Sequence, residues 1–115
     1  MTKLIQASIA AIISLSFSNA AMAACSDPLG PKVDWSGCDK NHAYLTSADL
    51  TGADLTGANL YAANLYNADL GGADLRRADL TYANLMDAYL YGADLTDAIW
   101  TDGRLCAANS IGVCN

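Results

Sequence analysis

The chain has 115 residues, and its 12 acidic residues outnumber the 6 Lys and Arg, which gives a formal net charge of −6. That balance argues against a protein that binds the phosphates of nucleic acids. All the acidic residues are Asp, a residue that favours turns over helices. His42 is the single histidine, and no Ser or Cys has a base at motif spacing, so we expect no enzyme, no cofactor and no metal.

The N-terminus has the layout of a secretory signal peptide over residues 1–23. One Lys precedes an apolar run, Ile9–Phe17, and the segment ends in the small-residue stretch Ala21–Ala23. This pattern predicts cleavage after Ala23 and a periplasmic or secreted protein. The apolar run is too short to span a bilayer, and we expect no transmembrane segment. Alternatively, "MAAC" is a lipoprotein box that anchors the chain through Cys25.

Four cysteines lie in two pairs on either side of the central part of the chain: Cys25, Cys38, Cys106 and Cys114. An even number of cysteines in an exported chain indicates disulfides. We favour local pairing, Cys25–Cys38 and Cys106–Cys114, where each closed loop contributes about 2.5–3 kcal/mol in the chain-entropy model. A zinc site built from all four is the alternative, but it lacks a CxxC pair and requires the two ends to meet.

The central part repeats every five residues. Leu recurs from Leu45 to Leu95, Ala precedes each Leu by two positions, and Asp or Asn usually stands between them. A helix turns about 100° per residue, and a strand alternates its faces, so neither keeps these leucines on one side. The two residues after Leu favour turns. The pattern predicts a square coil with Ala and Leu inside, and Trp100 and Leu105 continue the series as further inward residues.

The stretch "ADLTGADLTGANL", residues 48–60, resembles the A(D/N)LXX pattern of the pentapeptide repeat family. The resemblance covers about residues 33–105, with two degenerate repeats at its start. It implies an all-β, right-handed quadrilateral β-helix of just under four coils in a single domain. We expect these parts: a signal peptide over 1–23, an N-terminal cap with degenerate repeats over 24–42, the solenoid over 43–105, and a C-terminal cap over 106–115.

Four repeats per coil stack residues that are twenty apart in the sequence. One such column is acidic: Asp34, Asp54, Asp74 and Asp94. We interpret it as a solvated side balanced by Arg76 beside it and by Arg77 stacked under Asp97. Weak Ca²⁺ binding is the alternative, although one carboxylate per coil makes a poor set of ligands.

Aromatic residues form the second surface feature. We expect two adjacent sides of the coil to carry four tyrosines, with Met86 near them: Tyr44, Tyr61, Tyr66 and Tyr82. This group is a candidate contact patch for an unknown protein or a surface carbohydrate. The alternative is that Tyr simply suits exposed β positions, as we also assume for Tyr89 and Tyr91.

Together these features favour an exported, non-enzymatic structural or interaction module with an unknown partner, which we expect to be a monomer. The resemblance supplies one alternative, because some pentapeptide repeat proteins inhibit type II topoisomerases by mimicking DNA. The acidic surface agrees with that role. The signal peptide and the paired cysteines disagree with it, because topoisomerases are cytosolic.

Overall fold

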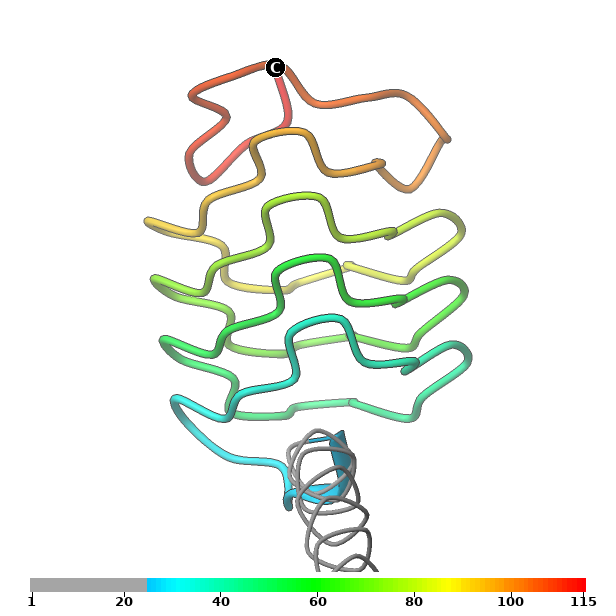
Figure 1. Ribbon diagram of the computed structural model, residues 1–115, viewed down its shortest axis with the longest axis vertical. Coiled ribbons are helices and arrows are strands. Elements are labelled where there is room, and N and C mark those ends of the chain that lie inside the picture. The colour runs from blue at the N-terminus through cyan, green and yellow to red at the C-terminus, as the bar shows by residue number, and fades with distance from the viewer. Residues whose placement is uncertain (1–24) are drawn as a thin grey trace, which may run out of the picture.

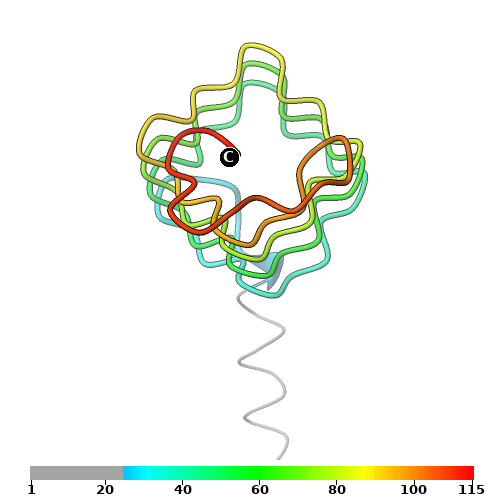
Figure 2. The same cartoon turned by 90° about the horizontal axis from the view of Figure 1, so that it is seen from above.

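The computed structural model describes residues 25–115, so the predicted signal peptide and its cleavage site after Ala23 lie outside the described residues. Residues 25–26 are helical, and the chain then winds into stacked square coils (Figures 1 and 2). From one coil to the next, the β pairing consists of isolated parallel bridges between residues twenty apart, such as Asp34 with Asp54, and not of longer strands. Four five-residue repeats therefore make one coil. Within residues 25–115, no helix is long and apolar enough to cross a membrane.

Each coil has four sides, and we number them by the residues that point outward and stack. Side 1 carries Asp34, Asp54, Asp74 and Asp94; side 2 carries Asp39, Asn59, Asp79 and Ile99; side 3 carries Tyr44, Asn64 and Asn84; side 4 carries Asp49, Asp69 and Tyr89. Two corner residues separate each side from the next.

The inside of the coils is filled by the Ala and Leu of each repeat. The fully buried leucines, with no exposed surface, are Leu50, Leu55, Leu60, Leu65, Leu70, Leu75, Leu80 and Leu95. Backbone hydrogen bonds hold the coils together, as where the Leu50 N–H donates to the Asp69 carbonyl at 2.8 Å and the Asp69 N–H donates to Ala48 at 2.9 Å. Each buried Leu contributes about 1.5–3 kcal/mol of hydrophobic stabilisation.

The corners are type II turns. The N–H of Ala53 donates to the Leu50 carbonyl at 3.0 Å, and the same bond recurs at later corners. The second corner residue of a type II turn needs a positive φ, which Gly57 has at 65° and Ala62 at 55°. In the repeats, the non-glycine residues in this conformation are Lys32, His42, Ser47, Ala62, Asn67, Arg77, Tyr82, Asp87 and Asp97. None of them is β-branched, because a branched Cβ is strongly disfavoured at positive φ.

The N-terminal end is closed by the degenerate repeats. Trp35 is only 3% exposed, and its Nε1 donates to the Asp27 carbonyl at 3.1 Å. Lys40 occupies an inward position, from which its Nζ donates to the Cys25 carbonyl at 2.7 Å and lies 3.9 Å from the Trp35 ring centroid. A disulfide joins Cys25 to Cys38. In these two repeats, Trp35 and Lys40 therefore stand at the positions of Leu and bind the N-terminal cap.

The expectation that Leu105 is a further inward residue was wrong. Leu105 is 64% exposed and pairs with Ile99 in an antiparallel bridge, so the chain has reversed direction before it. Gly103, with φ of 86°, stands where the repeat requires Ala, and the Trp100 N–H donates to Arg104 across the reversal. Fourteen inward positions from Trp35 to Trp100, at four per coil, make three and a half coils instead of just under four.

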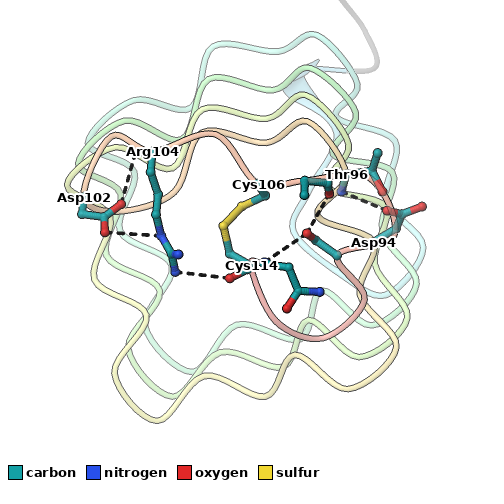
Figure 3. The surroundings of a disulfide bond; sticks show 9 residues. Asp94, Thr96, Asp102, Arg104, Cys106 and Cys114 are labelled. Atoms are coloured by element: carbon teal, nitrogen blue, oxygen red, sulfur yellow. Dashed lines mark hydrogen bonds and ion pairs between the residues drawn. A yellow bond between two sulfur atoms is a disulfide. The ribbon is translucent and has the colours of Figure 1, made fainter.

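The C-terminal segment covers one half of the last coil (Figure 2). A disulfide joins Cys106 to Cys114, and Arg104 lies between the Cys114 carbonyl, 3.2 Å from its Nη2, and the Asp102 carboxylate, 3.4 Å from its Nε (Figure 3). The buried Ser110 accepts the Leu95 N–H at 2.8 Å through its carbonyl. These contacts fix the segment to sides 1 and 2 of the end.

The corner geometry leads to a test at Gly57, where an added Cβ would meet no atom within 4 Å. Any loss of stability on substitution there is therefore conformational and not steric. We expect Gly57→Val to lower the free energy of unfolding by about 1–2 kcal/mol, because left-handed backbone is costly for branched residues. Gly57→Asn is the matched control and should lose clearly less in the same urea titration. Equal losses for the two variants would contradict the type II assignment of this corner.

Candidate interaction face

Side 3 and its two corners bring the predicted patch together. The outward column is Tyr44, Asn64 and Asn84, joined by parallel bridges from one coil to the next. We define the aromatic face as this column, the corner before it and the corner after it. The corner before contributes His42, Tyr61 and Tyr82, and the corner after contributes Tyr66 and Met86.

The corner before side 3 carries a row of rings, one per coil. His42 and Tyr61 meet edge to face at 5.8 Å between ring centroids, and Tyr61 meets Tyr82 in the same way at 5.5 Å. Edge-to-face pairs of this kind add about 0.5–1.5 kcal/mol beyond their buried area. The sequence analysis considered His42 only as the single histidine, although its position forty residues before Tyr82 places both in one column.

The patch residues are well exposed. The exposed fractions are 80% for Tyr44, 71% for Tyr82 and 65% for Met86, and they fall to 40% for Tyr66 and 37% for Tyr61. The row of rings therefore has a packed middle and open ends. Tyr89 and Tyr91 lie on side 4 and its following corner, where their ring centroids are 6.2 Å apart.

The aromatic face differs in charge from the rest of the coil. Among residues 25–115, side 3 alone has no carboxylate in its outward column, and Asp87 beside Met86 is the single acidic corner residue next to it. The amides of Asn64 and Asn84 stand where the other sides carry Asp. An otherwise acidic chain therefore presents a strip with a single carboxylate, Asp87, that combines aromatic rings with amide groups.

The outward Asp and Asn residues have a structural role that the sequence analysis missed. Their Oδ1 accepts a hydrogen bond from the N–H of the first corner residue, which lies two positions later. The Thr51 N–H donates to Asp49 at 3.1 Å, and the Met86 N–H donates to Asn84 at 3.0 Å. Such a bond fixes the start of the turn. The side-chain and backbone hydrogen bonds from the first corner residue hold the pKa of Asp34, Asp39 and Asp49 below the ordinary value.

On side 1, Arg76 balances the acidic column. Its Nη2 lies 2.6 Å from the Asp74 carboxylate and its Nε lies 3.9 Å from that of Asp94, one coil away. The hydrogen bond from Arg76 lowers the pKa of Asp74 and raises that of Arg76 itself. Arg77, expected to balance Asp97, makes no ion pair within the described residues. No group of three or more His, Cys, Asp or Glu side chains in residues 25–115 is placed to hold a metal ion.

The turn-capping carboxylates make stability depend on pH. The folded-state pKa of Asp49 is lowered, so its contribution is present above the unfolded pKa of about 4 and is lost as the pH falls through the folded value. Asp49→Asn keeps the acceptor oxygen but cannot titrate. We expect its melting temperature to match that of the wild type at pH 7 and to fall less between pH 5 and 2.

Asp49→Ala is the control, because it removes the acceptor oxygen at every pH and should melt lower throughout. Identical acid profiles for Asp49→Asn and the wild type would show that this carboxylate is not hydrogen-bonded in the folded protein.

Comparison with known proteins shows what the chain is similar to. A family model described as pentapeptide repeats matches in 8 copies over residues 32–60 and 58–97. Among solved structures, a pentapeptide repeat protein from the thylakoid lumen of Arabidopsis thaliana is 37% identical, with a TM-score of 0.56 over 56% of this chain and 45% of that one. No curated protein matches the sequence.

Two cyanobacterial structures are also similar. Rfr23, a pentapeptide repeat protein from Cyanothece 51142, is 39% identical, with a TM-score of 0.48 over 61% of this chain and 45% of that one. HetL from Nostoc sp. PCC 7120, a pentapeptide repeat protein involved in the regulation of heterocyst differentiation, is 34% identical, with a TM-score of 0.46 over 65% and 41%. The chain spans less than half of each of these structures. The Arabidopsis structure and the family match imply a right-handed β-helix.

Proposed function

This chain belongs to the pentapeptide repeat family, and we propose that it is an exported, non-enzymatic interaction module that contacts its partner through the aromatic face. The observation that carries the proposal is the gathering of exposed aromatic residues on the side without a carboxylate column, where Tyr44 is 80% and Tyr82 71% exposed. Exposed aromatic clusters with hydrogen-bonding neighbours are typical of contact surfaces. An uncharged protein surface or a carbohydrate fits this chemistry.

Export is supported by three independent features. The N-terminal 23 residues have the composition of a secretory signal peptide. Both cysteine pairs are within bonding distance, and disulfides persist in oxidising compartments. The Arabidopsis neighbour comes from the thylakoid lumen, which also lies outside the cytosol.

A non-enzymatic role is supported by the way the coils are filled. The interior is occupied by Leu side chains with no exposed surface, from Leu50 to Leu80. Enzyme sites are concave and hold most of the substrate surface, and the Leu side chains leave no room for a substrate along the axis of the coils. The proposal therefore assigns function to the outer surface.

Export and disulfide formation can be tested by intact mass. We expect protein isolated from the periplasm or the medium to begin at Ala24 and to accept four alkyl groups only after reduction. Proteolysis without reduction should then give the linked peptides Cys25–Cys38 and Cys106–Cys114.

Two other results of the intact-mass measurement would contradict parts of the proposal. An uncleaved cytosolic chain with four free thiols would contradict export and favour the DNA-mimic inhibitor of a type II topoisomerase. A diacylglyceryl addition on Cys25 would indicate a lipoprotein, and would leave Cys38 without its disulfide partner.

The aromatic face can be tested by co-sedimentation with isolated cell envelopes of the source organism. We expect the double variant Tyr44→Asn, Tyr82→Asn to lose at least tenfold in bound fraction, because it removes the two most exposed tyrosines of the face. Asn tolerates the left-handed backbone of Tyr82, so the fold should be kept.

Tyr91→Asn is the matched control, since Tyr91 is 78% exposed but lies at the corner after side 4. Binding that survives the double variant, or that is lost equally in the control, would show that the aromatic face is not the contact surface.

A further inference from the structure

Every coil but the last is covered on sides 3 and 4 by the next coil. The Leu65 N–H donates to the Asn84 carbonyl at 2.9 Å, and other donors of this half coil are paired in the same way. The Asn67 N–H donates to the Met86 carbonyl at 3.0 Å, and the Leu70 N–H donates to the Tyr89 carbonyl at 2.8 Å. The returning bonds run from Asn84 to the Ala63 carbonyl and from Tyr89 to Ala68, both at 2.9 Å.

The same five groups of the last coil have no partner among residues 25–115. They are the N–H groups of Leu85, Asp87 and Leu90 and the carbonyls of Ala83 and Ala88. The apolar side chains beside them are also uncovered. Leu65 and Leu70 have no exposed surface, whereas Leu85, Ala88 and Leu90 are partly exposed. We call residues 83–90 the open edge.

The open edge exists because the C-terminal segment lies over the other half of the end. Ile111 and Leu105 bridge to Asp94 and Ile99 on sides 1 and 2, and the Cys106–Cys114 disulfide closes that segment on itself. Figure 2 shows the resulting end, with one half of the square covered and the other half uncovered. A complete coil of a second copy cannot be added, because half of its path is already occupied.

We propose that the open edge accepts an extended segment of a partner polypeptide, about two repeats long, in which a small residue and Leu alternate around an outward polar residue. This is the pattern that covers the same two sides elsewhere, since residues 63–72 lie over 43–52 and residues 83–92 lie over 63–72. Unpaired strand edges bind other chains in this way. The inference goes beyond the proposed function, because it rests on the unpaired backbone groups of the last coil and not on the exposed aromatic rings of the aromatic face.

The test uses a blocked synthetic peptide of residues 63–72, ANLYNADLGG, added at millimolar concentration to the disulfide-bonded protein. Amide hydrogen exchange is measured by NMR. We expect exchange at Leu85, Asp87 and Leu90 to slow at least tenfold, while the already paired amides of Leu65 and Leu70 do not change. The same peptide carrying Leu65→Asp and Leu70→Asp should have no effect, because its inward side chains are charged.

A protein variant gives the matching control. Leu90→Lys places a charge at the open edge, and Lys40 at the other end shows that these coils accept Lys at an inward terminal position. We expect it to weaken peptide binding at least tenfold and to leave slow exchange at Leu65 and Leu70. Tyr91→Lys, one residue away at the corner, should bind as the wild type does.

Three results would overturn the inference. The first is unchanged exchange at the open edge with saturating peptide. The second is slowing confined to amides of the aromatic face outside the open edge, which would place the peptide at the surface of the proposed function. The third is protection of Leu85, Asp87 and Leu90 without peptide that increases with protein concentration, which would show that a second copy occupies the edge.

Discussion

The structure depends on one hydrogen bond, which is repeated along the chain: the N–H of an inward residue donates to the carbonyl nineteen residues later. Leu50 to Asp69 and Leu55 to Asp74, both at 2.8 Å, are two of its copies. This spacing fixes four repeats per coil, so each residue stacks on the residue at the equivalent repeat position of the next coil. Leu is buried on Leu, and outward Asp is placed above outward Asp about 5 Å apart. Both the filled interior and the charged columns follow from the same bond.

Stacking like charges would destabilise the coils if the carboxylates had no other partners. The structure offsets this in two ways. Each outward Asp or Asn accepts the N–H of the next corner, so the residue that repeats in the column also holds its own turn. On side 1, Arg76 adds a cation that reaches Asp74 and Asp94. The acidic columns are thus explained by turn formation, and the aromatic face is distinctive because Asn holds the turns there without charge.

The repeating part could be predicted from the sequence, because its period, its small inward residue and its turn residues are all local signals. The interpretation of Asp49 and its equivalents as merely outward was incomplete, since a hydrogen bond from side chain to backbone within a turn leaves no trace in hydrophobic periodicity. Leu105 shows a different limit. It keeps the five-residue spacing, but Gly103 replaces the Ala before it, and the antiparallel bridge to Ile99 reverses the chain. Spacing alone does not reveal such a reversal.

The two ends show why a repeating chain must break its own pattern. A coil that continues exposes unpaired backbone groups wherever it stops. At the N-terminal end, Trp35 and Lys40 replace Leu and bind the segment that carries Cys25. At the C-terminal end, a short antiparallel return covers only sides 1 and 2, and its disulfide closes it on itself. The path of the cap over sides 1 and 2 therefore leaves Leu85 and Leu90 as the partly exposed end of an otherwise buried leucine core.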